Sequence, residues 1–349
     1  MAWFEDLQTK LGASWPAIAA ARARTDETFA ALRDALAEFE TETTAIVFFG
    51  SLGRGEMTSG SDADWALLID GPSSSDHFRM AGRIGDRVRT PGLKSPGRTG
   101  TFGDLVSSHS LVHYIAGIRD TNENLTRRVL LLTESRAVGN DALRARVIQN
   151  VLERYVVHDP VVRTGEPRPL VPHFFFNDIV RYWRTITADF ASKMWERDQE
   201  QWALKSVKLR FSRKLLFAWG LLAAFSFELF PPEDGAQIRN DPLRSSQFLA
   251  EFIGRQTNVT PIDMLSRVLL LQDEDFNARL IFDAYDKFLA TVDNGNDRNL
   301  LESANAANAP HCAPFVSLYA ASEKFHDGLN AVFNDGAKLK PLIRRYGLF

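Results

Sequence analysis

Two short segments carry most of the structural information in this chain: FFGSLGRGE at residues 48–56 and SDADW at residues 61–65. The apolar run at residues 45–49 predicts a buried β-strand that stops at Gly50-Ser51. A polar, glycine-rich turn follows, and a second apolar run at residues 65–69 predicts another strand. The pattern therefore indicates two strands joined by a turn that carries polar groups.

The two carboxylates of the second segment are separated by one residue. Side chains alternate between the faces of a strand, so Asp62 and Asp64 are expected to point the same way. Neighbouring carboxylates repel each other, and a divalent cation between them removes that cost. Magnesium suits such a pair, since it takes one or two carboxylates and completes its shell with water and phosphate oxygens.

The glycine-rich turn fits the same chemistry. Gly50 lacks a Cβ, so a polyphosphate can approach the backbone closely. The amides of residues 51–55 are expected to form an anion-binding nest, to which the Ser51 hydroxyl adds a donor. Arg54 is expected to reach a phosphate or a carboxylate with its forked guanidinium. Together with the acidic pair, the turn predicts a site for a nucleoside triphosphate and Mg²⁺.

A Gly-Ser turn followed by Asp-x-Asp resembles the signature of the DNA polymerase beta-like nucleotidyltransferase superfamily. The run Gly-Arg-Gly-Glu at residues 53–56, with Thr58 and the Ser-Asp pair at residues 61–62, is similar to the bacterial branch that includes the signalling uridylyltransferases. The resemblance covers residues 44–70 closely and residues 98–135 more loosely. Some members of the superfamily have lost catalysis and act as regulators, so an active enzyme and an inactive regulator both stay open at this point.

The resemblance implies a third carboxylate on a neighbouring strand, where it helps to hold the catalytic metal and accepts a proton from the incoming hydroxyl. Asp104 is the candidate, since a lone carboxylate on a core strand is costly without a metal or a partner. A position in a turn after Gly103 is the equal alternative. Asp70 and Glu134 are weaker candidates, because one closes a strand and the other lies in a helical pattern.

Basic and hydroxyl side chains share a face in the segment at residues 205–214. Lys205, Lys208 and Ser212 are spaced one helical turn apart, which suits the β- and γ-phosphates of a triphosphate. The resemblance implies such a lysine and serine from a helical second domain, and Lys208 and Ser212 match, with Lys205 as a substitute for the lysine. A solvated basic face is the alternative, and it is where we place Arg210, Arg213 and Lys214.

Composition limits the other possibilities. The chain has 349 residues with 45% hydrophobic and 24% charged residues, which is typical of a globular protein. A formal net charge of -3 does not favour nucleic acid as a partner. The single cysteine, Cys312, excludes an intrachain disulfide and favours a reducing compartment, so we expect a cytoplasmic protein. The longest apolar segment, residues 215–230, is interrupted by polar residues and does not predict a membrane span.

The sequence divides into four parts. Residues 1–43 are expected to be helical and to pack on the catalytic domain, and residues 44–158 to form the nucleotidyltransferase domain, with strands at 44–50, 62–70 and 99–107. Four prolines in residues 159–173 predict a linker. Residues 174–349 predict a bundle of helices. The expected fold class is α+β: a small mixed sheet flanked by helices, followed by an all-α domain.

The function that we expect is Mg²⁺-dependent transfer of a nucleoside monophosphate to a hydroxyl on a small molecule or a protein, with release of pyrophosphate. Asp62, Asp64 and Asp104 would bind the metal, for which Mn²⁺ is the alternative, and ATP or UTP would be the substrate. The alternatives are a synthase or tailing enzyme that joins nucleotides or acts on RNA, and an inactive nucleotide-binding regulator. The acceptor and the oligomeric state are not indicated.

Overall fold

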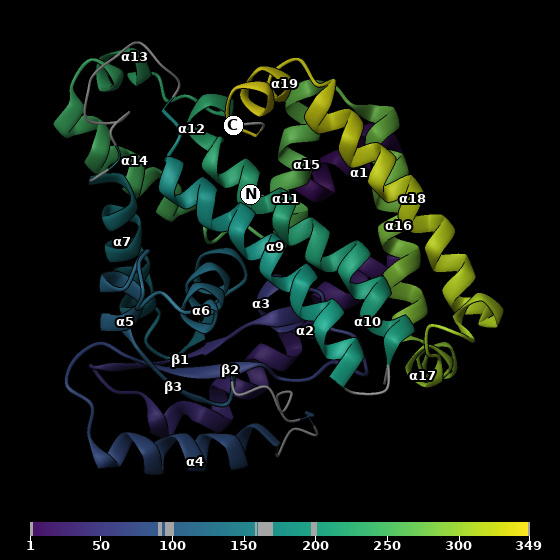
Figure 1. Ribbon diagram of the computed structural model, residues 1–349, viewed down its shortest axis with the longest axis horizontal. Helices are drawn as coiled ribbons and strands as arrows, with labels where there is room; N and C mark the ends of the chain where they lie inside the picture. Colours follow the sequence, from purple (N-terminus) through teal and green to yellow (C-terminus); the bar gives the residue numbers. More distant parts are fainter. Residues whose placement is uncertain are drawn as a thin grey trace.

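The computed structural model describes residues 3–89, 93–94, 101–157, 159, 170–196 and 201–347. A small β-sheet lies at one end of the molecule, and helices make up the rest (Figure 1). This arrangement confirms the expected α+β class. None of the helices in these ranges combines the length and apolar content that crossing a bilayer requires.

The sheet has four strands in the order β3-β2-β1-β4. They are β1 (Thr44–Phe48), β2 (Trp65–Ile69), β3 (Asp104–Ser107) and β4 (Arg136–Val138). β1 runs antiparallel to both β2 and β4, whereas β2 and β3 are parallel. Phe48 stands opposite Trp65, so the end of β1 and the start of β2 meet at the segment that joins them. The first two strands were predicted, whereas β3 is shorter than expected and β4 was missed.

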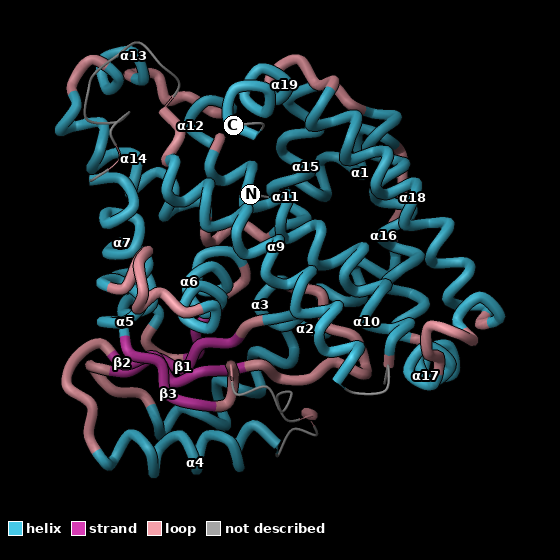
Figure 2. The backbone as a smooth tube through the Cα atoms, viewed as in Figure 1, coloured by secondary structure: helices cyan, strands magenta, loops and turns pink. Residues whose placement is uncertain are grey.

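Helices cover both faces of this sheet (Figure 2). They are α3 (Gly50–Arg54), α4 (Ser75–Arg89), α5 (Ser108–His113), α6 (Asn122–Thr133) and α7 (Asp141–Val157). Ile46, Phe48 and Leu67 face α4 and the N-terminal helices in one hydrophobic cluster. Val47 and Leu68 face the other way, into a larger cluster that continues through the C-terminal helices. Burial on both faces explains why β1 and β2 are continuously apolar.

The C-terminal region is helical, as predicted. Its elements are α9 (His173–Glu196), α10 (Trp202–Lys208), η2 (Leu209–Arg213), α11 (Lys214–Ala224), α12 (Ser226–Leu229), α13 (Gly235–Arg239), α14 (Pro242–Gln256), α15 (Pro261–Gln272), α16 (Asp275–Asp293), α17 (Gly295–Ser303), η3 (Ala309–His311), α18 (Ala313–Asn334), α19 (Leu339–Leu342) and η4 (Ile343–Gly347). Residues 202–230 are divided among α10, η2, α11 and α12. Most of the proline-rich linker lies outside the described residues, so that domain boundary stays a prediction.

The N-terminal helices join the two parts of the chain. They are α1 (Trp3–Leu11), α2 (Pro16–Leu36) and the turn η1 (Ala37–Phe39). α2 packs on α4 and β4, as expected, but α1 packs on α15 and α2 also packs on α16. The Trp15 indole donates a hydrogen bond to Asp283 at 2.8 Å, and the Ile18 amide donates one to Asp286 at 2.9 Å. The segment therefore bridges the sheet and the C-terminal helices.

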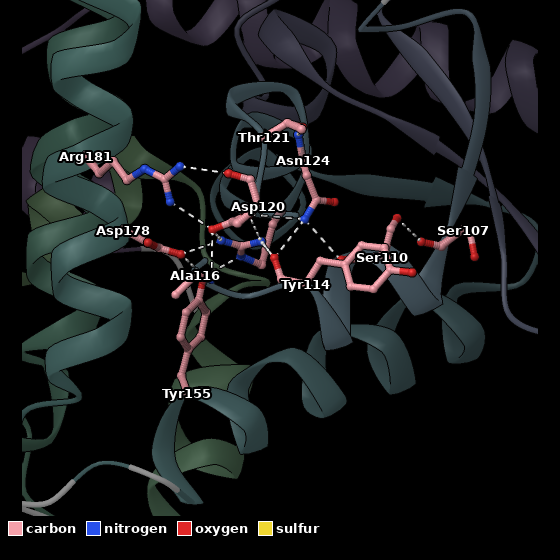
Figure 3. A network of polar contacts seen from close by, with 11 residues as sticks. Ser107, Ser110, Tyr114, Ala116, Asp120, Thr121, Asn124, Tyr155, Asp178 and Arg181 are labelled. Atoms are coloured by element: carbon pink, nitrogen blue, oxygen red, sulfur yellow. Dashed lines mark hydrogen bonds and ion pairs between the residues drawn. The ribbon is translucent and has the colours of Figure 1, made fainter. Parts of the chain in front are cut away.

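A buried polar network also connects the two parts (Figure 3). Arg128 of α6 has a fully buried side chain and forms ion pairs with Asp120 at 2.9 Å and with Asp178 of α9 at 2.6 Å. The Tyr155 hydroxyl of α7 donates to Asp178 at 2.7 Å, and Arg181 of α9 pairs with Asp120 at 2.8 Å. These contacts fix α9 against α6 and α7.

Candidate active site

A cavity lies between the segment that joins β1 to β2 and the C-terminal helices. The residues that line it from the first side are Gly50, Ser51, Arg54, Glu56, Thr58, Ser61, Asp62 and Asp64. Those that line it from the helical side are Lys208, Ser212, Arg213, Phe288, Leu289, Val292 and Arg298. The structure thus brings together the predicted turn, the acidic pair and the predicted lysine and serine, which lie more than 140 residues apart in the sequence.

The acidic pair is left without internal partners. Neither the Asp62 nor the Asp64 carboxylate forms a hydrogen bond or an ion pair with any side chain in the part of the chain that the structure describes. Burial and the neighbouring Asp62 charge raise the pKa of Asp64 to about 7, although Arg213 and Lys208 oppose the shift. Two neighbouring carboxylates that repel each other and form no direct ion pair are a donor set that suits a hard divalent cation. The residues therefore fit Mg²⁺.

Two features favour glycine at position 50: its left-handed backbone conformation and the closeness of the Asp64 side chain. Its φ of +65° lies in the left-handed region that favours glycine. A Cβ at this position would lie 3.0 Å from Oδ2 of Asp64. The amide of Gly50 donates to Oε1 of Glu134 at 3.1 Å. The turn therefore lies directly against one metal-binding candidate, Asp64, and is tied by Glu134 to the C-terminal end of α6.

Arg54 lines the cavity, and of the two contacts expected for it the structure shows the contact with carboxylates. It is buried, its Nε donates to Glu56 at 2.9 Å, and it forms an ion pair with Glu134. Burial alone lowers the pKa of Arg54, but the Glu56 and Glu134 carboxylates raise it above its usual value. A guanidinium committed to two carboxylates supports the turn, and these contacts do not agree with the expected phosphate contact.

The predicted nest is also smaller than expected. The residues form a turn of helix, in which the amides of Gly53, Gly55 and Glu56 donate to backbone carbonyls of residues 49, 52 and 51. Those three amides are therefore used within the turn. The Ser51 hydroxyl lines the cavity and remains the predicted phosphate donor of this segment.

The helical side of the cavity contains a π-helical turn, η2, between α10 and α11. Lys208 and Ser212 both line the cavity, and the Ser212 hydroxyl donates to the carbonyl of Lys208 at 3.1 Å. Burial lowers the pKa of Lys208, Asp62 opposes this effect, and Arg298 and Arg213 add to it. Lys205 is not among the residues that line the cavity. The substitute role that we considered for Lys205 thus gains no support from this arrangement.

Arg213 was predicted to be solvated but lines the cavity. A π-helical turn holds one residue more than an α-helical turn, which changes the face on which the following residues lie. Arg213 approaches Glu134 at 3.5 Å, and Glu134 and Asp64 are among the charges that raise its pKa against the effect of burial. The regular spacing assumed for this segment therefore assigned Arg213 to the wrong face.

Asp104 lies away from the cavity. It is exposed at the first position of β3 and stands opposite Ala66, two residues beyond Asp64. Its carboxylate accepts from the amide of Leu105 at 2.7 Å. Among the described residues, no group of three or more histidine, cysteine or acidic side chains is arranged to hold a metal. The geometry therefore supports Asp62 and Asp64 alone as protein ligands and gives Asp104 no such role.

Two contributions to the site carried no signal in the sequence. Glu134, considered only as a weak third ligand, instead positions Gly50 and Arg54. Arg298 comes from α17, and nothing in its local sequence distinguishes it from an ordinary solvent-exposed arginine.

Comparison with known families agrees with this geometry. Residues 30–158 match the model of the nucleotidyltransferase domain family. A search of curated proteins gave no match to the chain. The matched range contains the sheet, the turn, the acidic pair and Glu134. Residues 30–158 therefore form a nucleotidyltransferase domain of the DNA polymerase beta-like superfamily.

Proposed function

We propose that the protein transfers a nucleoside monophosphate from ATP or UTP to a hydroxyl group of a small molecule or a protein side chain, with Mg²⁺ or Mn²⁺ as the metal. The observation that carries the proposal is the division of charge across one cavity. Asp62 and Asp64 lie on the sheet side without a direct ion pair among the described residues, and Lys208, Arg213 and Arg298 lie on the helical side. Such a cavity suits a metal at one side and a polyphosphate at the other.

The roles of the residues follow from this division. Asp62 and Asp64 would hold the metal, which would supply positive charge to stabilise the negative charge that develops on the phosphates. Ser51 would bind phosphate oxygens from the turn, and Lys208 and Ser212 would bind the β- and γ-phosphates that leave as pyrophosphate. Glu134 would keep Gly50 in place, because its carboxylate accepts the Gly50 amide.

A small molecule or a protein is favoured over RNA as the acceptor. The net charge of -3 provides no broad positive field for a polyanion. A synthase that joins two nucleotides, a tailing enzyme and an inactive regulator remain as alternative outcomes of the test.

The test is transfer of label from each α-³²P nucleoside triphosphate, with Mg²⁺ and a cell extract that supplies acceptors. Label in a metabolite or a protein supports the proposal, label in RNA or in a dinucleotide supports the synthase or tailing alternative, and nucleotide binding without pyrophosphate release supports the regulator. The double variant Asp62→Asn and Asp64→Asn is expected to abolish pyrophosphate release. Asp104→Asn is the matched control, because Asp104 is an exposed carboxylate of the same domain outside the cavity. Pyrophosphate release that survives in the double variant would refute the mechanism.

A further inference from the structure

Arg298 reaches the cavity from a helix remote in sequence from the nucleotidyltransferase domain. Its side chain is about nine-tenths buried, and it lines the cavity together with Asp62 and Lys208. Its Nε donates to Glu302, one turn further along α17, at 2.8 Å. Within the described ranges, no partner is recorded for its Nη1 and Nη2 atoms. A largely buried guanidinium therefore offers unpaired N–H donors to a cavity that is also lined by the cationic side chains of Lys208 and Arg213.

The backbone beneath Arg298 leaves room for it. A Cβ on Gly60 would lie 2.4 Å from both Cζ and Nε of Arg298 and 2.6 Å from its Nη1. Gly60 does not have a positive φ, so its conformation does not require glycine. The absence of a side chain at Gly60 instead allows the guanidinium to lie against the loop that carries Asp62.

The loop that carries Gly60 and Asp62 is anchored to the junction between α16 and α17. The amide of Ser59 donates to Oδ1 of Asp293 at 2.7 Å, and its hydroxyl donates to the Asp293 carbonyl at 2.9 Å. Asp293 is the last residue of α16, and Asn294 caps α17. The contacts of Ser59 with Asp293 thus hold the loop that carries Asp62 close to Arg298.

The cations that line the helical side of the cavity favour an anion there. Arg298 and Arg213 both contribute to the lowered pKa of Lys208, in addition to burial, which means that the three cations stand close enough to disfavour one another. A polyphosphate relieves this repulsion, and a guanidinium binds phosphate through two parallel N–H donors. Asp62 and Asp64 face the cations, so the phosphates nearest the cations are the terminal ones when the metal is at the α-phosphate.

We infer that Arg298 binds the terminal phosphates of the nucleoside triphosphate and that Gly60 is the position that makes room for it. The inference rests on the proposed function and names a phosphate-binding and specificity-determining residue for it. Arg298 makes the site select triphosphates over monophosphates, because a monophosphate does not extend to the helical side of the cavity.

The experiment measures binding by calorimetry in the full-length protein, with Mg²⁺ and α,β-methylene-ATP, α,β-methylene-UTP, AMP and UMP as probes. Arg298→Gln is expected to weaken binding of the preferred triphosphate analogue by about 10- to 100-fold and to change binding of the monophosphate less than about threefold. Arg298→Lys is expected to recover part of the loss, since it keeps the charge without the fork.

Gly60→Ala provides an independent test that leaves Arg298 in the sequence. It is expected to reproduce the selective loss of triphosphate affinity by displacing the guanidinium. Gly295→Ala at the start of α17 is the matched control, because a Cβ there meets nothing within 4 Å. Circular dichroism melting of each variant confirms that the fold is retained.

The outcomes separate this inference from the proposed function. If the wild-type protein binds a triphosphate analogue and Arg298→Gln binds it with the same affinity, the inference is overturned and the proposed function is not. Equal loss of triphosphate and monophosphate affinity would also overturn it, since Arg298 would then only support the fold. Failure of the wild-type protein to bind either triphosphate analogue would overturn the proposed function together with the inference.

Discussion

Replacing Arg128 with methionine tests whether the buried network holds the two parts of the molecule together. The side chain of Arg128 is 0% exposed, so methionine fills most of its volume but leaves Asp178 without a cation. Asp120 keeps Arg181 at 2.8 Å, and Asp178 keeps the Tyr155 hydroxyl at 2.7 Å. Removal of one partner from a buried ion pair costs about 3–5 kcal/mol, and we expect Arg128→Met to lower the free energy of unfolding by about that amount at pH 7.

Urea denaturation followed by tryptophan fluorescence measures this free energy. Arg181→Met is the control, because Arg181 is about one-third exposed and its removal leaves Asp120 paired with Arg128. We expect the control to cost about 1 kcal/mol, in the range of partly solvated pairs. A loss below 1 kcal/mol in Arg128→Met would refute the view that the network stabilises the fold.

The pH dependence of the same variants gives a second check. Burial favours the neutral form of Asp120, but the hydrogen bond and charge of Arg128 hold the pKa of Asp120 below its usual value. This contribution to stability is present above the unfolded pKa and is lost as pH falls through the lower folded pKa, so it disappears below about pH 4. In Arg128→Met the carboxylates need no cation once they are protonated. The difference in stability between the variant and the wild-type protein should therefore narrow as pH falls.

Three further predictions concern the candidate active site. Gly50→Ala is expected to lower the free energy of unfolding by about 1–3 kcal/mol and to reduce pyrophosphate release, because the new Cβ meets Asp64. The control is Gly12→Ala: Gly12 has a φ of +56° and a Cβ there would meet no atom within 4 Å, so this variant introduces the backbone strain alone and should retain activity. The pKa of Asp64 is raised to about 7, and Mg²⁺ binds the ionised carboxylate. Mg²⁺ affinity measured by calorimetry should therefore increase by about tenfold for each unit of increasing pH up to pH 7 and stay constant above it, and a pH-independent affinity would contradict this assignment. Glu134→Gln should destabilise the protein in urea by about 3 kcal/mol because Arg54 and Arg213 lose a buried carboxylate, whereas Glu123→Gln in an exposed helical pair should cost less than about 0.5 kcal/mol.

The sequence was most informative where one local rule determined the structure. The apolar runs before and after the turn predicted β1 and β2, because both strands are buried on both faces and contain no polar interruption. The acidic pair and the glycine turn were predicted for the same reason, since their chemistry is contained in fifteen consecutive residues, 50–64. β4 has only three residues and lies at the edge of the sheet, so it produced no run long enough to recognise.

Residues whose roles depend on distant partners were not predictable. The local sequence left a phosphate and a carboxylate open as partners for Arg54, and its ion pair with Glu134, eighty positions later, could not be predicted. Arg213 was misplaced because the π-helical turn changed the spacing, and local propensity does not reveal such a turn. The two positions considered for Asp104 could not be distinguished because the register between parallel strands is set by tertiary packing rather than by the residues of either strand.

The arrangement of the residues that line the cavity depends on contacts between residues that do not line it. Lys208 and Ser212 are held by a helix continuous with α11, and α11 packs on α9. The two helices approach closely at Gly220, where a Cβ would lie 2.7 Å from the Ile179 side chain. The Arg128 network in turn fixes α9 to α6. Because the acidic pair belongs to the sheet and the cations belong to these helices, loosening this network should separate the two halves of the site and weaken triphosphate binding in Arg128→Met more than the same variant weakens monophosphate binding.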